Sequence, residues 1–251
     1  MIIAYLIYDS YSLRACTLTC YSWYIAAVPH LHHTFAIIFV PWCLNLWPLY
    51  FLRSMHVLGL LPLFKDLRIH VEEHLYHGLS AERFDRSILR YFLALTNVRN
   101  LRLDYLDIPS FMARVQQYFG HFFPTVESLT LKTPKGSYRQ IVYFIGLFQH
   151  LEDLELICDP AGPRQDQPGD LTLVPPFTPP LRGWLKVQCF TEVELLKVMI
   201  GLFGGIQFRG VDLSAVQEVQ LLLDACAKTL ETLILRPIEA RGKQRHLGCG
   251  F

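Results

Sequence analysis

The sequence predicts an α/β chain, in which a short all-helical N-terminal region is followed by an irregular solenoid of parallel strands that alternate with helices. Three observations lead to this fold class. A short phrase with alternating leucines recurs along the chain, amphipathic stretches lie between its copies, and a separate helical pattern occupies the first 35 residues. Because each unit contains one strand and one helix, neighbouring units can cover one another's apolar faces.

The repeated phrase consists of an apolar residue, two or three others, and then Leu-x-Leu or its equivalent. Apolar residues that alternate over so short a stretch indicate half-buried strands. The copies start about 25 to 34 residues apart, except that the last gap is nearly twice as long and holds a degenerate copy near residues 206–213. The clear copies are FKDLRI at 64–69, VRNLRL at 98–103, VESLTL at 126–131, LEDLEL at 151–156, RGWLKV at 182–187 and LETLIL at 230–235.

Amphipathic stretches between these phrases predict the helices of the repeat. Their apolar residues recur three or four positions apart, which places them along one face of a helix. Thr191 with Glu194, and Ser214 with Gln217, have the spacing of a capping box, so each pair is expected to open a helix. The three apolar faces are Phe84, Ile88, Phe92 and Leu95; Phe111, Val115, Tyr118 and Phe122; and Ile141, Phe144, Phe148 and Leu151.

A compact α/β fold with an ordinary parallel sheet accommodates the same elements, because the distance between strands leaves room for one helix per crossover. Six copies of a single phrase favour the curved solenoid instead. We expect the solenoid to span residues 64–237. A loop at 159–180, which holds seven prolines, would bulge from its surface, and a polar tail would follow at 238–251.

The N-terminal stretch 12–35 has the spacing of an apolar helix, or of two short ones. Ser12 is placed to cap its first turn. Leu18 and Ile25 lie off the main apolar stripe, so the segment is apolar on two sides, and either the chain's own core or a partner would cover the second side. The main stripe consists of Leu13, Cys16, Cys20 and Trp23.

Residues 36–63 are expected to form an apolar linker between this helical region and the solenoid. The overlapping stretch 34–52 runs for nineteen positions without a charge, close to the roughly 20 that a membrane-spanning helix needs. Pro41 and Pro48 interrupt it, and each removes a backbone donor. We therefore favour a buried strand, turn and helix over these residues, and a membrane span is the alternative.

Charge and cysteine content narrow the function classes. Lys and Arg number 23 against 22 Asp and Glu, and no basic stripe stands out, so nucleic acid is not expected as a partner. Apolar residues make up 52% of the chain, which excludes a disordered protein. The seven cysteines are scattered and odd in number, as in the reduced thiols of an intracellular protein of the cytoplasm or nucleus.

No sequence motif indicates catalysis or a cofactor. The chain lacks GxSxG, a P-loop, GxGxxG after a strand, and HExxH. The Cys and His residues between positions 16 and 33 have spacings that fit no zinc module. The charged residues 72–74 follow a predicted strand, where adjacent charges usually form a solvated edge. The sequence predicts a non-enzyme that holds no metal or cofactor.

The phrase SLRACTLTCYSW at 12–23, with a Pro and a histidine-rich exit at 29–33, resembles the second half of an F-box. This helical motif docks proteins onto a Skp-type adaptor of SCF ubiquitin ligases, and the phrase is typical of F-box families of mushroom-forming fungi. The Leu-x-Leu units resemble degenerate leucine-rich repeats, which are common in those proteins. The Leu-Pro start of an F-box has no counterpart before residue 12, and no capping repeat follows 237. Residues 1–35 are thus a partial F-box-like region, and both ends of the chain are expected to be incomplete.

The resemblance implies a substrate-recognition subunit of an SCF-type ubiquitin ligase. A Skp-type adaptor, and through it a cullin, would bind the F-box-like helices, and a protein substrate would bind the repeat face. The alternatives are a repeat scaffold that has lost adaptor binding, and a protein anchored in a membrane through 34–52. Trp23 is expected either to anchor the adaptor contact or to pin the F-box-like region against the linker. The adaptor-binding residues that the resemblance implies are Leu6, Leu13, Leu18, Cys20 and Trp23.

Outward residues of the predicted strands are the candidates for substrate contact, because they alternate with the buried leucines. Their charges are mixed, so they specify no substrate. The candidates are Arg68, His70, Arg102, Asp104, Thr130, Lys132, Glu155, Lys186 and Gln188.

Overall fold

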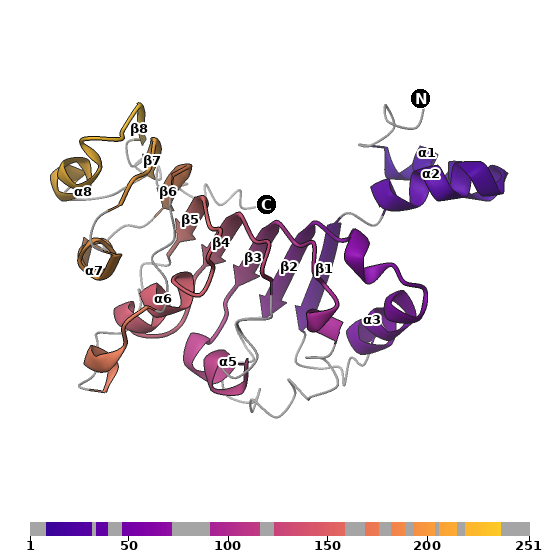
Figure 1. The fold of residues 1–251 in the computed structure, drawn as a ribbon, viewed down its shortest axis with the longest axis horizontal. Coiled ribbons are helices and arrows are strands. Elements are labelled where there is room, and N and C mark those ends of the chain that lie inside the picture. The colour runs from indigo at the N-terminus through magenta and orange to yellow at the C-terminus, as the bar shows by residue number, and fades with distance from the viewer. Residues whose placement is uncertain are drawn as a thin grey trace, which may run out of the picture.

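The structure is a computed structural model that describes residues 9–31, 34–39, 47–71, 91–115, 123–158, 169–175, 182–188, 193–203, 206–214 and 219–236. Two N-terminal helices lead into a chain of alternating strands and helices (Figure 1). The strands are β1 (Thr34–Phe39), β2 (Asp66–Val71), β3 (Asn100–Asp104), β4 (Ser128–Lys132), β5 (Asp153–Ile157), β6 (Trp184–Gln188), β7 (Gly210–Ser214) and β8 (Thr232–Arg236).

All eight strands belong to one parallel sheet whose strand order follows the sequence from β1 to β8. A doubly wound sheet reverses its strand order at a switch point, and this sheet has no such reversal. Each strand-and-helix unit therefore lies beside the next one, which is the layout of a solenoid. The prediction of an α/β chain with parallel strands in a solenoid-like arrangement is confirmed.

Every predicted Leu-x-Leu phrase forms a strand, and the degenerate copy near 206–213 contributes β7. The two apolar residues of each phrase point toward the helices and are at most 2% exposed from β2 to β7. Burial of each such side chain contributes about 1.5–3 kcal/mol, so the alternation itself defines the core. These residues are Leu67 and Ile69, Leu101 and Leu103, Leu129 and Leu131, Leu154 and Leu156, Leu185 and Val187, and Val211 and Leu213.

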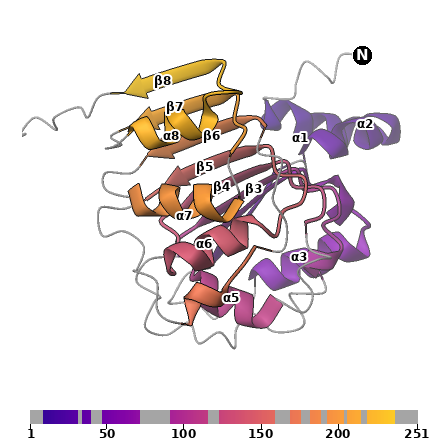
Figure 2. The ribbon, with the colours of Figure 1, turned by 60° about the vertical axis from the view of Figure 1, so that its left-hand side comes forward.

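Helices of the solenoid cover a single face of the sheet (Figure 2). They are α3 (Trp47–Val57), α5 (Ile108–Val115), α6 (Tyr138–Ile145), α7 (Val193–Phe203) and α8 (Val219–Cys226), with short 3-10 turns η2 (Leu61–Leu63) and η6 (Asp170–Thr172). The predicted helix-face residues that the structure describes with their side chains are all buried: Phe92, Leu95, Phe111, Ile141, Phe144, Phe148 and Leu151. The others, apart from Val115 at the end of α5, lie outside the described residues.

The predicted helix caps are not tested by the structure. Ser214 is the last residue of β7, and the residues that join it to Val219 lie outside the described ranges. A capping box that was not predicted opens α6, where the Gln140 N–H donates to Ser137 Oγ and the Ser137 N–H donates to Gln140 Oε1. Thr191 and Gln217 lie outside the described residues.

Two helices occupy residues 10–31, α1 (Ser10–Thr19) and α2 (Tyr21–Leu31), which is one of the two arrangements that the spacing allowed. Cys20 is extended (φ −161°, ψ 166°) and separates them. This break splits the predicted stripe, so Cys20 is exposed and does not share the buried side of Leu13. Asp9 caps α1 in place of Ser12, because its carboxylate precedes the first turn and accepts from two backbone N–H groups there.

The uncharged stretch 34–52 contains β1 and the first half of α3. A single membrane-spanning helix over these residues is therefore wrong, and the favoured strand and helix are present. β1 pairs with β2 from Thr34 and Asp66 to Phe39 and Val71, so the sheet begins within the segment predicted as helix and linker. Within the described ranges, no helix is long and apolar enough to cross a membrane.

Candidate binding surface

The sheet face opposite the helices, here called the open face, is formed by the outward residues of the strands. The register aligns them in rows that cross the strands, about 4.8 Å apart from one strand to the next. The first row holds Arg68, Arg102, Thr130, Glu155, Lys186 and Asp212, and the second holds His70, Asp104, Lys132, Ile157, Gln188, Ser214 and Arg236.

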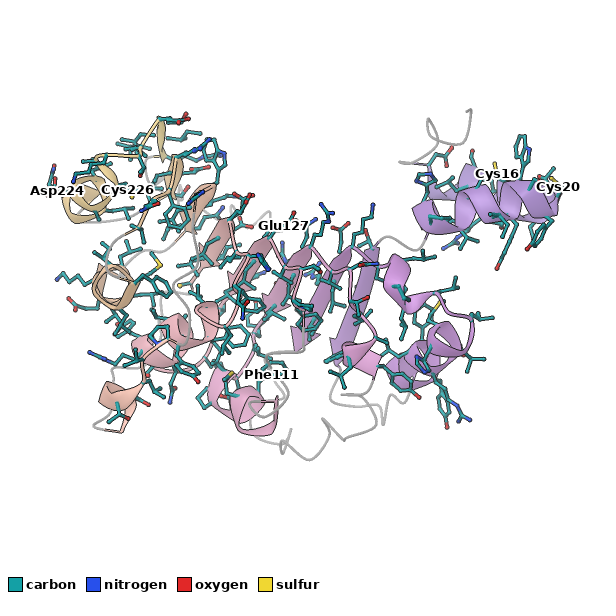
Figure 3. All side chains as sticks on the ribbon, in the orientation of Figure 1. Cys16, Cys20, Phe111, Glu127, Asp224 and Cys226 are labelled. Carbon is teal, nitrogen blue, oxygen red and sulfur yellow. The ribbon has the colours of Figure 1, made fainter. Side chains whose placement is uncertain are left out.

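All the predicted substrate-face candidates thus lie in these two rows, because the alternation of each strand and the register between strands agree. Whether they contact a substrate stays a prediction. Asp104 differs from the rest because its side chain is completely buried, so it acts on its neighbours and offers no surface of its own. Figure 3 shows Glu127 at the upper edge of the sheet and Phe111 on α5 below the strands.

Asp104 is the centre of the densest polar cluster on the open face. Its Oδ2 accepts a hydrogen bond from Arg68 Nε at 2.7 Å and forms an ion pair with Arg68 Nη2 at 2.6 Å. Its Oδ1 accepts from Nε of Arg102 at 2.9 Å, and His70 Nδ1 lies 3.2 Å from Oδ2. Two guanidinium groups from neighbouring strands therefore converge on one buried carboxylate.

Burial alone would raise the pKa of Asp104, because it penalises the charged form. The hydrogen bonds from Arg68, Arg102 and His70, together with the charge of Arg102, outweigh that effect and hold the pKa below its usual range. The carboxylate is consequently ionised at neutral pH, and it orients both arginines along the sheet.

Lys132 lies one strand away, in the same row as Asp104. Its Nζ is 5.4 Å from the centre of the Tyr105 ring, which is a cation–π distance. The same ring meets His70 edge-on at 5.6 Å. Tyr105 follows β3 with a positive φ of 59°, and this turn brings its ring between His70 and Lys132.

Charges on the other half of the open face are paired one to one. Lys186 Nζ is 2.6 Å from Glu155, which also accepts from Thr130 at 3.2 Å. Arg236 binds Asp212 through two nitrogens, at 3.1 and 2.8 Å. Sequence reasoning missed this last pair, because Asp212 lies in the degenerate copy and Arg236 follows the final one.

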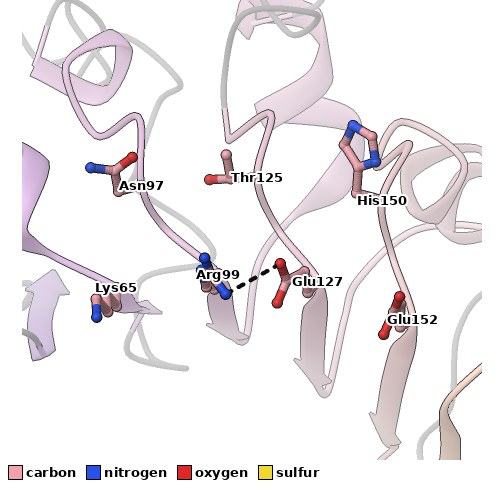
Figure 4. A pocket seen from close by; sticks show the side chains of 7 residues that line it. All are labelled: Lys65, Asn97, Arg99, Thr125, Glu127, His150 and Glu152. Carbon is pink, nitrogen blue, oxygen red and sulfur yellow. Dashed lines mark ion pairs between the residues drawn. The ribbon is translucent and has the colours of Figure 1, made fainter.

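A groove of about 500 Å³ runs along the N-terminal ends of β2 to β5 (Figure 4). The residues before β2, β3 and β4 each offer their carbonyl to two N–H groups of the next unit; Lys65 O, for example, accepts from Arg99 and Asn100. Arg99 and Glu127 form an exposed pair at 3.6 Å, which contributes little to stability. The lining residues are Lys65, Asn97, Arg99, Thr125, Glu127, His150 and Glu152. Sequence reasoning missed this groove, although a charged residue one position before each strand start was a visible signal.

The helix pair α1–α2 contains the described residues that the F-box resemblance implies. Leu13 is buried with Cys16 and Ala27 in a small cluster of their own. Leu18 and Cys20 are exposed, Leu18 at 88%, and Trp23 is 40% exposed. Leu6 lies outside the described residues. Leu13 thus packs between the two helices, whereas Leu18 and Trp23 are exposed.

Metal-ligating and reactive side chains are not gathered anywhere in the described part of the chain. No three His, Cys, Asp or Glu residues there could hold a metal ion. None of the cysteines in the described ranges forms a disulfide, and Cys20 is exposed whereas Cys16, Cys158 and Cys226 are buried. The predicted strand exit at 72–74 and two of the histidines near residue 33 lie outside the described residues.

Comparison of the chain with protein-family models, curated proteins and solved structures finds no match. The fold and the open face define the class of protein: an α/β chain with one all-parallel sheet in a solenoid-like layout.

Proposed function

We propose that this chain is a non-catalytic substrate receptor of an SCF-type ubiquitin ligase inside the cell. The α1–α2 pair would bind a Skp-type adaptor, which links it to a cullin, and the open face would bind the protein substrate. The strand-and-helix units would be degenerate leucine-rich repeats. The resemblance at 12–33 suggests the adaptor, and the repeat period suggests the family of the units.

The observation that carries this proposal is the apolar surface of the helix pair. A helical hairpin that served only its own chain would turn such side chains inward. Only a small cluster around Leu13 is buried between α1 and α2, and Figure 1 shows the pair standing beyond the β1 end of the sheet. The exposed apolar side chains of the pair are Tyr11, Leu18, Tyr21, Trp23, Tyr24 and Ile25.

The open face supports the second half of the proposal. Parallel repeats commonly bind proteins on an extended sheet surface. Here that surface is uncovered by the described helices, and its side chains are polar and held in fixed positions by ion pairs. Such a surface is suited to recognition of a protein segment.

Calorimetry with a purified Skp-type adaptor tests the adaptor half. The adaptor is titrated in parallel against two proteins, the chain as given and a version extended by a first helix that begins with Leu-Pro. Leu18→Ala is expected to weaken binding about tenfold or more, because burial of an exposed leucine contributes about 1.5–3 kcal/mol. Leu58→Ala is the matched control, since Leu58 is 63% exposed near α3.

Binding by either version, with a loss in Leu18→Ala alone, would support the receptor. Absence of binding by both versions would contradict it and leave a repeat scaffold without an adaptor contact. Leu13 is unsuitable for such a test, because it is buried within the helix pair and its replacement would change folding together with binding.

A further inference from the structure

The charges on the β2–β4 part of the open face do not balance. Arg68, Arg102 and Lys132 face a single described carboxylate within these two rows, that of Asp104. The nearest other carboxylates on this face have partners of their own. Asp66 accepts from Thr34 and Asn100, and Glu155 is held by Lys186. Among the described residues, a positive surplus therefore remains around Asp104.

Asp104 also leaves some hydrogen-bond donors of Arg68 and Arg102 without a partner among the described residues. It engages Arg102 only through Nε, so the two terminal nitrogens of that guanidinium have no partner among the described residues. Arg68 uses Nε and Nη2, which leaves Nη1. Lys132 contacts the Tyr105 ring and no described carboxylate. Since the side chains of Arg68 and Arg102 are 46% and 38% exposed, these donors reach solvent.

The unused donors are positioned in advance. The buried carboxylate holds both arginines in place, which removes much of the side-chain entropy that binding would otherwise cost. A planar guanidinium edge with two parallel N–H groups matches a carboxylate. The bidentate pair of Arg236 and Asp212 shows the same match elsewhere on this face.

The spacing of the donors suits an extended chain. Arg102 and Lys132 lie in rows that are two residues apart along the strands, a step of about 6.7 Å. Side chains i and i+2 of an extended peptide are also about 6.7 Å apart on one side. The flexible stem of Lys132 adjusts to the sideways step of about 4.8 Å between β3 and β4.

We propose that Arg68, Arg102 and Lys132 form a binding site for an extended acidic peptide segment with carboxylates at alternate positions. One carboxylate pairs with the terminal edge of Arg102, beside Arg68, and the next pairs with Lys132. Asp104 is the positioning residue of the site. The inference rests on the substrate role that the proposed function gives to the open face, and it does not depend on adaptor binding.

Fluorescence anisotropy with the full chain tests this site. The probes are labelled peptides of sequence Glu-Ser-Glu-Ser-Glu and Gln-Ser-Gln-Ser-Gln, and a third in which phosphoserine replaces the central Glu. We expect the Glu peptide to bind at least about tenfold more tightly than the Gln peptide at low salt, because two charge pairs are lost in the latter.

Two variants and one control locate the site. Lys132→Gln should weaken the Glu peptide about fivefold, and Arg102→Lys about threefold, because it keeps a donor for Asp104 but loses the planar edge. Lys186→Gln removes the same charge from the same face, but Glu155 already holds Lys186, so its effect should stay below about twofold. Circular dichroism checks that each variant is folded.

Equal affinity for the Glu and Gln peptides would overturn the site, as would equal losses in Lys132→Gln and Lys186→Gln, which would indicate net charge alone. A phosphoserine peptide that binds more than tenfold more tightly than the Glu peptide would overturn the carboxylate assignment in favour of phosphate. If the adaptor binds but the chain shows no preference for the Glu peptide, this inference alone is contradicted. If the adaptor does not bind but the Glu peptide does, the receptor proposal is contradicted and the peptide site is retained.

Discussion

The indole ring of Trp184 lies against Gly210 on the neighbouring strand, in the space that a Cβ atom at residue 210 would occupy. Gly210 is buried, whereas Trp184 remains 44% exposed. The missing side chain therefore allows a large aromatic ring to lie flat on the open face, next to Arg182 and Arg209 in a second groove of about 420 Å³.

Gly210→Ala should displace this ring. The new methyl group meets the indole at its ring-fusion atoms, so Trp184 must rotate toward solvent, at a cost of about 1 kcal/mol in the free energy of unfolding. Urea denaturation measures the cost. In a Trp184→Ala background the same substitution should be neutral, because the clash is gone and glycine is unfavourable in a strand. Equal costs in both backgrounds would show that the ring is not the obstacle.

Asp104→Asn should be the most destabilising change on the open face. It removes the charge that compensates Arg68 and Arg102 and leaves their donors facing a neutral amide. We expect a loss of about 2–4 kcal/mol, about 1 kcal/mol less than for a fully buried ion pair, because both arginines partly reach water. Glu155→Gln, which breaks a more exposed pair, should cost less than about 1 kcal/mol. Chemical denaturation measures the free energy of unfolding of both variants. Equal losses in the two would contradict the central role of Asp104.

The sequence predicts some features of these residues and not others. Period-two alternation predicted the strands and the outward direction of Arg68, Arg102 and Asp104, because side-chain direction in a strand is a local property. The burial of Asp104 could not be predicted, because two arginines from β2 and β3 cover it and their positions depend on the register between strands.

For β1, the sequence predicted a strand in the apolar stretch 34–52 but not that this strand belongs to the sheet. Its sequence, TFAIIF, has apolar residues on both sides of the strand, so it lacks the alternation that marks the other units. Its neighbour β2 supplies the register that makes it a strand of the sheet. The groove at the strand starts was missed for a related reason. Lys65, Arg99 and Glu127 precede their strands by one residue and come together only when the units stack.

Acid should remove the contribution of Asp104 to stability. Its pKa is lower in the folded state than the value of about 3.9 expected in the unfolded chain. The contribution is therefore fully present above about pH 4 and is lost as the pH falls through the folded pKa. The difference in unfolding free energy between the unmodified chain and Asp104→Asn should be constant from pH 5 to 7 and shrink below about pH 4. Urea titrations at each pH measure it, and a difference that persists at pH 2.5 would contradict an ionised Asp104.

Thiol labelling should separate the helix pair from the solenoid. Cys20 is exposed, whereas Cys226 is completely buried and burial raises the pKa of its thiol. Iodoacetamide should therefore label Cys20 at least about tenfold faster than Cys226, as read by peptide mass spectrometry at pH 8.

A variant of the helix pair extends this test. Leu13→Ala removes the main side chain buried between α1 and α2, at a cost of about 2–5 kcal/mol where the site cannot collapse. Labelling of Cys16, which packs beside Leu13, should then accelerate while that of Cys226 does not change, because the two thiols belong to separate apolar clusters. Equal acceleration of both thiols would mean that the helix pair and the solenoid unfold as one unit, and the α1–α2 pair would then be no independent docking element.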